Sequence, residues 1–406
     1  MTMQKVAENS SYRWIVVFAS ALILALAMGS IVNGLSAFVI PMQQAYGWMR
    51  ADISLINAAG IMGIAIGGVI MGILADRFGS RALVLMGSLV MGICYLLASQ
   101  ATSLWQFQAL MFLAGFLGAA AIFAPIMAAV GNWFPIGAGL AIGIASAGQA
   151  LGQGGVPVVS SMLIRQYGID GALAITGAAM LIFLVPLSLL LRPAPGAIAS
   201  MSDAHDPGLA DYPPFPMVVA FLSTAIVLCC TCMSVPLMHL VPLVQDRGFA
   251  PVDAGRVIFA MLVIAVAGRI AFGKLADIIG ALPAYMTATL WMTLMVYGFI
   301  FMNTLDGFFI YAIIYGFGYA GVMTGVLVSV ASLTHPSRRA SALGIVGFFG
   351  WLGHANGGFL GGFVFDQTGQ YDLAYAIAAA TGIANLVVVS ILYMKVRGPG
   401  QRAATA

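Results

Sequence analysis

The sequence predicts an all-α membrane protein with twelve transmembrane helices in two pseudo-symmetric six-helix bundles. Hydrophobic residues make up 62% of the 406 residues and charged residues only 7%, whereas a soluble domain needs about a quarter of its residues charged. The apolar runs are long enough for membrane helices, and the two halves of the chain repeat each other. Because lipid offers no partner for backbone amides, only helices or a closed barrel can span a membrane.

The apolar runs favour helices over barrel strands. A membrane helix needs about 20 apolar residues, whereas barrel strands have about 10 residues of alternating polarity. The first run is too long for a cleavable signal peptide, and more spans follow it, so we expect it to be helix 1. The twelve expected spans are 14–40, 53–74, 82–98, 104–129, 139–160 and 172–191 in the first half, and 216–243, 255–275, 282–303, 307–331, 341–363 and 373–394 in the second.

A polar segment separates the two sets of spans. Residues 192–214 are rich in Pro, Ala, Ser and Asp and contain no apolar span. We therefore expect an N-terminal bundle at 1–191, a cytoplasmic linker at 192–214 and a C-terminal bundle at 215–406.

The basic residues predict the orientation. With the N-terminus inside, eleven of the 16 Lys and Arg residues fall in cytoplasmic segments and four in external loops, and Arg269 lies within a span. The positive-inside rule then places both termini in the cytoplasm of a multi-pass protein of the cell inner (plasma) membrane. The small net charge of +3 gives no indication of a nucleic-acid partner.

The two halves are copies at one constant offset. Asp76 lies in Gly72-Ile-Leu-Ala-Asp-Arg-Phe-Gly79 and Asp277 in Gly273-Lys-Leu-Ala-Asp-Ile-Ile-Gly280, and 277 − 76 = 201. The same offset pairs Pro41 with Pro242, Gly47 with Gly248, Asp52 with Asp253, Gly115 with Gly316, Ala141 with Ala342, and Gly143 with Gly344. Parallel halves of this kind imply a binding site near the bilayer midplane and alternating access by rocking.

These paired segments resemble the signature of the major facilitator superfamily, a match that covers nearly the whole chain. The stretch from Phe134 to Gly148 looks like the helix 5 signature of the monocarboxylate porters, with Leu140, Ala141, Gly143, Ala145, Ala147 and Gly148 matching. The basic triplet of that signature is replaced here by Ile136, Gly137 and Ala138. Residues 47–54 look like an external segment common in bacterial members and oxalate/formate exchangers. The resemblance implies the major facilitator fold.

Arg269 is the strongest candidate for substrate binding. It lies in an otherwise apolar stretch of helix 8, and an arginine near mid-membrane costs about 2.5 to 3.5 kcal/mol on insertion scales. Its guanidinium presents a planar fork that matches a carboxylate. The resemblance implies the same role, since monocarboxylate porters place their substrate-binding arginine on helix 8. The alternative is a structural ion pair or carbonyl clamp near Lys274.

The proton route cannot be carried over from the family. Its animal members have an Asp one turn before this Arg, where this chain has Ala265, and the family lysine of helix 1 has no counterpart. His354 in helix 11 could instead bind a proton or the substrate, because the ordinary pKa of a histidine lies near neutrality. Oxalate/formate exchangers, which resemble this chain, carry a lysine in this region. The alternative is a neutral His hydrogen-bonded between helices.

Further polar and aromatic side chains within spans are candidate substrate contacts. Facing a cavity they would bind substrate oxygens, and facing a neighbouring helix they would hold the bundle together. They are Asn33 in helix 1, Gln149 and Gln153 in helix 5, and Tyr315 and Tyr319 in helix 10. The resemblance implies an aromatic that restricts the pocket at the helix 10 position.

Gating residues are expected at the cytoplasmic helix ends. There an acid can bind a helix N-terminus or an arginine and hold the inward gate shut. We assign this role to Asp76, Arg77, Arg81 and Asp277.

The sequence predicts no enzyme. No nucleophile–base set appears, so we expect no catalytic residue, no metal and no cofactor. Cys229 and Cys232 form a nominal C-x-x-C, but no second pair or nearby acid accompanies them within this apolar helix.

We therefore expect a secondary transporter of a small organic anion, namely a symporter that takes up a lactate- or pyruvate-like monocarboxylate together with a proton. The expected partners are this carboxylate, the proton and the lipid bilayer, with the protein as a monomer. An anion exchanger of the oxalate/formate type is the first alternative, with Arg269 and protonated His354 as a two-cation clamp. A membrane sensor or scaffold that transports nothing is the second.

Overall fold

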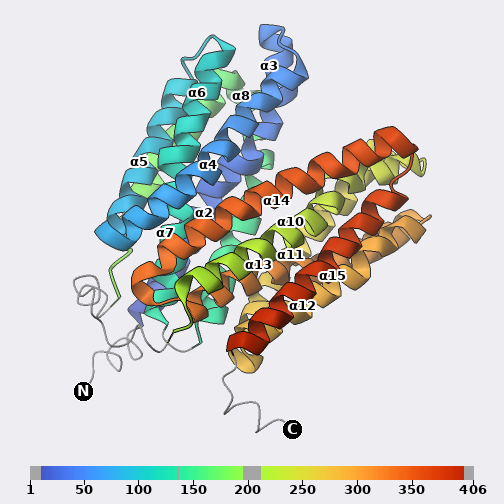
Figure 1. Ribbon diagram of the computed structural model, residues 1–406. Coiled ribbons are helices and arrows are strands. Elements are labelled where there is room, and N and C mark those ends of the chain that lie inside the picture. Colours follow the sequence, from blue (N-terminus) through green and yellow to red (C-terminus); the bar gives the residue numbers. More distant parts are fainter. Residues whose placement is uncertain (1–10, 135–136, 195–211, 397–406) are drawn as a thin grey trace. The chain divides into compact units, whose positions relative to one another are not determined.

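The computed structural model describes residues 11–134, 137–194 and 212–396 (Figure 1). Residues 195–211 of the expected linker lie outside this part of the chain, as do Ile136 of the helix 5 signature and Lys5, Arg397 and Arg402 of the cytoplasmic basic set. The described residues are almost entirely helical. The chain divides into two compact units, Met1–Asp206 with Pro336–Phe348, and Pro207–His335 with Phe349–Ala406.

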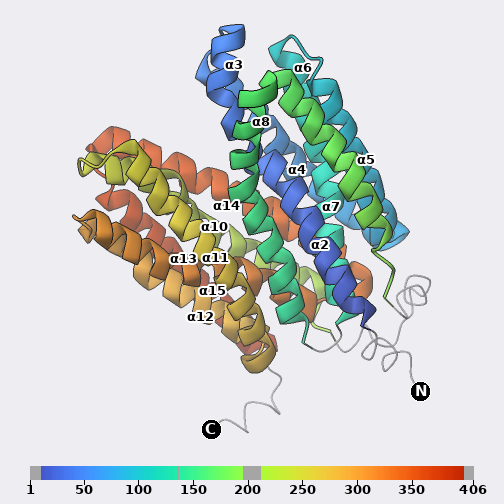
Figure 2. The same cartoon turned by 180° about the vertical axis from the view of Figure 1, so that it is seen from behind.

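Unit 1 begins with a long broken helix. This is followed by the helices of spans two to six, which pack side by side (Figure 1). The elements are α2 (Tyr12–Met28), η1 (Gly29–Asn33), η2 (Gly34–Phe38), α3 (Val39–Tyr46), α4 (Arg50–Phe78), α5 (Ser80–Ala98), α6 (Leu104–Leu113), η3 (Ala114–Ala119), α7 (Ala120–Trp133) and α8 (Ala138–Leu189). In the view from behind, α8 runs along α2 (Figure 2).

Unit 2 contains the helices of the second half. They are α10 (Phe215–Asp246), α11 (Pro251–Ile279), α12 (Ala281–Val296), η5 (Tyr297–Phe301), α13 (Leu305–Leu333) and α15 (Asp372–Val396), together with most of α14 (Arg339–Thr368). Helix α14 follows the short η6 (Pro336–Arg338), and its first turns belong to unit 1. The closest helix pairs in unit 2 are α11 with α13, and α12 with α13.

Ten helical segments of the described chain are long and apolar enough to cross a membrane. One of them, α8, is 52 residues long and holds both of the spans expected at 139–160 and 172–191. Gly168, with φ 73° and ψ −175°, divides it into two helices. The 30-residue α14 is not among the ten, because its many glycines, His354 and Asn356 lower its mean hydropathy. With these two adjustments the described residues are consistent with the twelve helices that the sequence predicted.

The internal repeat is visible in the backbone. Left-handed glycines end helices at positions 201 residues apart, because a residue without a Cβ adopts positive φ at no steric cost. The pairs are Gly47 (φ 71°) with Gly248 (89°), Gly79 (86°) with Gly280 (95°), and Gly168 (73°) with Gly369 (68°). The aromatic contacts repeat as well: Trp48 packs edge-on against Phe107 in unit 1, and Phe249 against Phe308 in unit 2.

Helix packing follows the same repeat. In unit 1, Gly67 of α4 lies against the backbone of Phe116, so that a Cβ would find no room. In unit 2, Gly268 of α11 lies in the same way against the backbone of Phe317, which is Phe116 shifted by 201. Glycine also lets helix backbones approach closely in α8, where Gly152 meets the carbonyl of Ala25.

Candidate functional site

Arg269 is buried in α11, with 7% of its surface exposed. The glycine before it, Gly268, brings α11 against α13, and the guanidinium interacts electrostatically with Tyr319 of that helix. Tyr319 is itself 5% exposed. An arginine guanidinium keeps its positive charge at physiological pH. Arg269 therefore places a permanent cation beside the Tyr319 phenol, between two tightly packed helices. Together they form a cationic group with a neighbouring hydrogen-bond donor.

The two predicted tyrosines of α13 have different surroundings. Their rings are stacked, with centroids 5.5 Å apart and planes 4° from parallel. Tyr315 is fully buried and lies edge-on to Phe299 at 5.1 Å, and its hydroxyl has no hydrogen-bond partner among the described residues. Only Tyr319 therefore lies next to Arg269, and Tyr315 packs behind it in the core of unit 2.

His354 lies in α14, and the described contacts of its ring are with residues of the same helix. Its ring bonds to the backbone of Gly350 one turn earlier, and its centroid lies 5.9 Å from that of Trp351. The backbone carbonyl of His354 accepts a hydrogen bond of 2.7 Å from Ser234 of α10. None of these contacts joins the imidazole to Arg269.

Other polar side chains of unit 2 fasten α14 to α10. Asn356 donates to the Thr231 hydroxyl at 3.2 Å, and this hydroxyl donates to the carbonyl of Gly353 at 3.3 Å. His239 lies near one end of α10, with Nε2 2.9 Å from the carbonyl of Gly358. Such interhelical hydrogen bonds satisfy polar groups that have no water to bind in the membrane interior. We therefore assign these residues a role in helix packing.

The predicted polar residues of unit 1 lie on helix 1 and on α8. Asn33 sits where helix 1 changes from the π-helix η1 to the 3-10 helix η2, and its carbonyl accepts a 2.6 Å hydrogen bond from Ser36. Gln149, on α8, is 8% exposed, and Gln153 one turn later is half-buried. Both follow a glycine that packs on α2. Asn33, Gln149 and Gln153 thus all lie in unit 1, and no described hydrogen bond joins them to one another.

Asn57 was missed by the sequence reasoning. It lies in α4 and donates a 3.0 Å hydrogen bond to the carbonyl of Val32, which belongs to the π-helical segment η1 of helix 1. A signal was available, because Asn57 is the one amide side chain in the otherwise apolar run 53–74. Its significance depends on the break in helix 1, which no residue pattern predicted.

Among the predicted gating residues, Asp76 has the clearest geometry. It lies near the end of α4 and accepts hydrogen bonds from the backbone amides of Ala340 (3.0 Å) and Ser341 (2.8 Å), as well as from the Ser341 hydroxyl. These are unsatisfied donors of the first turn of α14. Arg339, at the start of the same helix, donates to Asn132 of α7 at 2.7 Å. All these groups belong to unit 1.

The remaining predicted gating residues lie at helix ends. Arg77 and Arg81 are exposed, and the Arg77 guanidinium lies over the Phe78 ring, with Cζ 5.5 Å from the ring centre. Asp277 lies in the last turn of α11 and is half-buried. The described partners of Asp76 are the amides and hydroxyl of α14, not these two arginines.

Comparison with known proteins identifies the family. The model of the Major Facilitator Superfamily matches residues 17–277 and 220–406, which together span almost the whole chain. The chain belongs to the Major Facilitator Superfamily. It is thus a multi-pass membrane transporter of this superfamily and not an enzyme, as the sequence predicted.

Relatives and solved structures agree with this membership. The chain is 27% identical to monocarboxylate transporter 13 of Rattus norvegicus over 384 residues, which cover 92% of this chain and 87% of that protein. It is 28% identical to monocarboxylate transporter 13 of Bos taurus over 386 residues, with the same coverage. The crystal structure of the human organic anion transporter MFSD10 has a TM-score of 0.75 at 15% identity and covers 94% of this chain and all of that one. This last likeness concerns the fold.

Proposed function

We propose that this superfamily member is a secondary transporter of small organic anions, and that its substrate is a monocarboxylate moved together with a proton. The observation that carries the proposal is the burial of Arg269 beside Tyr319 in unit 2. A buried guanidinium is costly unless it has a role, and its planar fork binds a carboxylate through two parallel hydrogen bonds. The monocarboxylate transporters among its relatives support this substrate class.

In this proposal the substrate carboxylate docks on Arg269 and the Tyr319 hydroxyl donates a further hydrogen bond to it. Asn33, Gln149, Gln153 and His354 are proposed as additional substrate contacts from the other spans, and Tyr315 supports Tyr319 from behind. The pair of Arg269 and the substrate carboxylate has no net charge, because one carboxylate compensates one guanidinium. That compensation lowers the cost of carrying the anion through a medium of low dielectric.

The proton has two candidate carriers. Ala265, one turn before Arg269, is buried and offers no titratable group at the position where the family's animal members have an acid. The proton therefore travels either on His354 or on the substrate itself. We further propose that both termini face the cytoplasm, that the protein resides in the inner (plasma) membrane as a monomer, and that Asp76, Arg77, Arg81 and Asp277 belong to the cytoplasmic gate.

Uptake into proteoliposomes tests the proposal. The purified protein should accumulate radiolabelled lactate or pyruvate when the lumen is alkaline relative to the outside, and collapse of the pH gradient by an ionophore should abolish the accumulation. Equally fast counterflow of oxalate and formate without any response to the pH gradient would contradict it and would favour the exchanger alternative. Absence of any flux with properly folded protein would instead favour a sensor or scaffold.

A further inference from the structure

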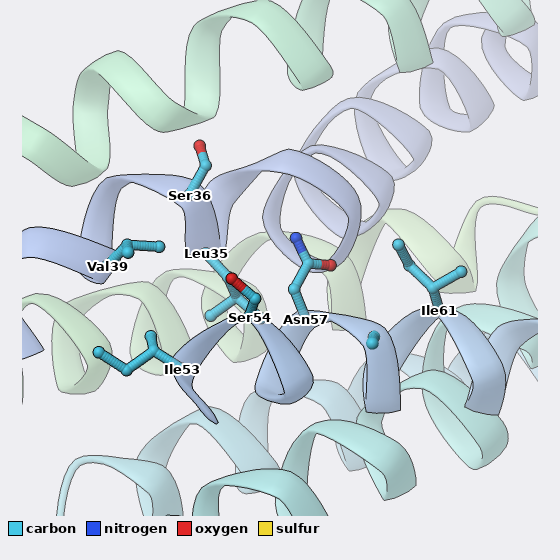
Figure 3. A pocket seen from close by; sticks show the side chains of 8 residues that line it. Leu35, Ser36, Val39, Ile53, Ser54, Asn57 and Ile61 are labelled. Carbon is cyan, nitrogen blue, oxygen red and sulfur yellow. The ribbon is translucent and has the colours of Figure 1, made fainter. Parts of the chain in front are cut away.

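Unit 1 contains a cavity next to the break in helix 1 (Figure 3). Its volume is about 320 Å³, at the small end of the range of about 300–1,000 Å³ for small-molecule sites. It is lined by helix 1 residues Leu35, Ser36 and Val39 and by α4 residues Ile53, Ser54, Asn57, Ala58 and Ile61. The cavity thus lies between the second part of helix 1 and the first half of α4.

Asn57 gives this cavity its polarity. Its amide nitrogen donates to the carbonyl of Val32 at 3.0 Å, and since a carbonyl can only accept, this bond fixes which end of the amide is nitrogen. The other end, Oδ1, is buried and has no hydrogen-bond partner among the described residues. Figure 3 shows the amide directed toward helix 1, with Ser54 beside it on α4. An acceptor in this position requires a ligand that donates a hydrogen bond.

The lining selects against ions. None of its eight residues is ionisable. The described charged or titratable side chains of α3, α4 and α8 are not among the lining residues; they are Tyr46 in α3, Asp52, Asp76 and Arg77 in α4, and Arg165, Tyr167 and Asp170 in α8. Tyr46 and Asp170 are directed at each other, with their oxygens 3.4 Å apart. A carboxylate has only acceptor oxygens and would meet the lone pairs of Asn57 Oδ1 with no cation to compensate it. A protonated carboxyl group carries the donor that Oδ1 lacks.

We propose that this cavity binds the undissociated form of a short branched-chain carboxylic acid. The acid O–H donates to Asn57 Oδ1, and the alkyl group packs on Leu35, Val39 and Ile53. The hydroxyls of Ser36 and Ser54 line the same space. No proton is transferred in the cavity, because the acid enters and leaves it as the neutral molecule. The place of this step in transport rests on the proposed function, in which the substrate itself is one of the two candidate proton carriers.

Cysteine protection tests the cavity without relying on transport. Ala58 lines the cavity and is exposed, and the four native cysteines are buried, so Ala58→Cys adds one accessible thiol for a maleimide. Three probes of one shape are compared: 3-methylbutanamide, which is neutral and donates; 3-methylbutanoic acid; and its methyl ester, which has no donor. Met49→Cys, 68% exposed and outside the cavity, is the control thiol.

The amide should slow labelling of the Ala58→Cys thiol equally at acidic and alkaline pH, relative to labelling without a probe at the same pH. The acid should protect only where it is undissociated, so its half-protecting concentration should rise about tenfold for each pH unit above its pKa. The ester should give no protection, and Met49→Cys should be labelled at the same rate throughout. Equal protection by the ester, or protection by the acid independent of pH, would overturn the proposal.

Second-site variants connect the effect to Asn57. Asn57→Leu in the Ala58→Cys background should abolish protection by the amide. Because this change also removes the bond to Val32, Ile61→Trp serves as a second variant that fills the cavity and leaves the amide in place; it too should abolish protection. Asp52→Asn should leave the pH dependence unchanged. Persistent protection in Ile61→Trp would contradict the assignment of the ligand to this cavity.

The same assay separates this inference from the proposed function. Arg269→Gln should lose transport but keep full protection of the Ala58→Cys thiol by the amide, since Arg269 does not line the cavity. If the amide fails to protect the Ala58→Cys thiol while transport still depends on Arg269, only the neutral-acid site is contradicted. Normal transport in Arg269→Gln with protection intact would defeat only the proposed role of Arg269.

Discussion

The carboxylate of Asp76, near the end of α4, accepts hydrogen bonds from both the backbone amide and the hydroxyl of Ser341 in the first turn of α14. An anion at this place compensates the partial positive charge of the helix N-terminus. Residues 336–348, which contain this turn, belong to unit 1 together with Asp76. Helix α14 is thus fastened to α4 at its start.

Asp76→Asn should weaken this attachment. The amide keeps one acceptor but loses the charge, so we expect a loss of about 0.5–2 kcal/mol of stability, as for other helix caps. Thermal unfolding in detergent measures the loss. Asp306→Asn, in the first turn of α13, is the matched control, because Thr304 already caps that helix through Gly307. If the two changes lower the stability equally, the contact of Asp76 with Ser341 makes no specific contribution to it.

Gly152 and Gly154 of α8 form a matched pair for the packing of helix 1. A Cβ at Gly152 would collide with the backbone of Ala25, whereas one at Gly154 would meet nothing within 4 Å. We therefore expect Gly152→Ala to cost about 1–3 kcal/mol and Gly154→Ala to be neutral or stabilising by up to about 1 kcal/mol, the helix propensity difference. Unfolding temperatures of the two variants measure this, and a stable Gly152→Ala would contradict the described packing.

The stacked tyrosines of α13 should respond differently to loss of their hydroxyls. Tyr319 lies within electrostatic reach of Arg269, so Tyr319→Phe should weaken the apparent affinity for a carboxylate by about tenfold, the equivalent of about 1.4 kcal/mol. The Tyr315 hydroxyl is buried without a partner among the described residues, so Tyr315→Phe should leave affinity unchanged. Competition by unlabelled lactate in uptake assays provides the measurement. The reverse order of effects would place the substrate on the Tyr315 side.

His354→Gln should leave uptake responsive to a pH gradient. The ring bonds within its own helix and packs near Trp351, and a glutamine can keep a local hydrogen bond without titrating. We expect a similar dependence of the uptake rate on external pH in both proteins, with at most a severalfold change in rate. A variant that still exchanges substrate but no longer responds to the gradient would assign the proton to His354.

Much of the fold could be predicted from the sequence. Membrane helices are recognised by the length and apolar composition of their segments, and the internal repeat indicates how these helices are grouped into two halves. Gly168 and Gly369 end helices at equivalent positions with nearly the same φ, which extends the predicted offset to the whole backbone. The sharp division of α8 at Gly168 and the break at Asn33 were not predictable in this way. Both depend on local backbone geometry and tertiary packing rather than on apolar periodicity.

The candidate site was only partly accessible to sequence reasoning. Arg269 stands out because charge is costly in an apolar helix, and Asp76 because it recurs in Asp277. Tyr315 and Tyr319 share one helical face, so their spacing could not show that only Tyr319 lies next to Arg269. The role of Asn57 depends on its hydrogen bond to the Val32 carbonyl in the distorted part of helix 1. Such a distortion cannot be recognised from the residue types alone.

The central claim is that Arg269 holds the substrate carboxylate, and carboxylate-dependent thermal stabilisation of the purified protein tests it most directly. We expect lactate or pyruvate to raise the unfolding temperature of the parent chain, and to do so far less for Arg269→Lys, which keeps the charge but loses the planar fork. Arg269→Gln should show no stabilisation at all. Full stabilisation of both variants by the same carboxylates would contradict the account.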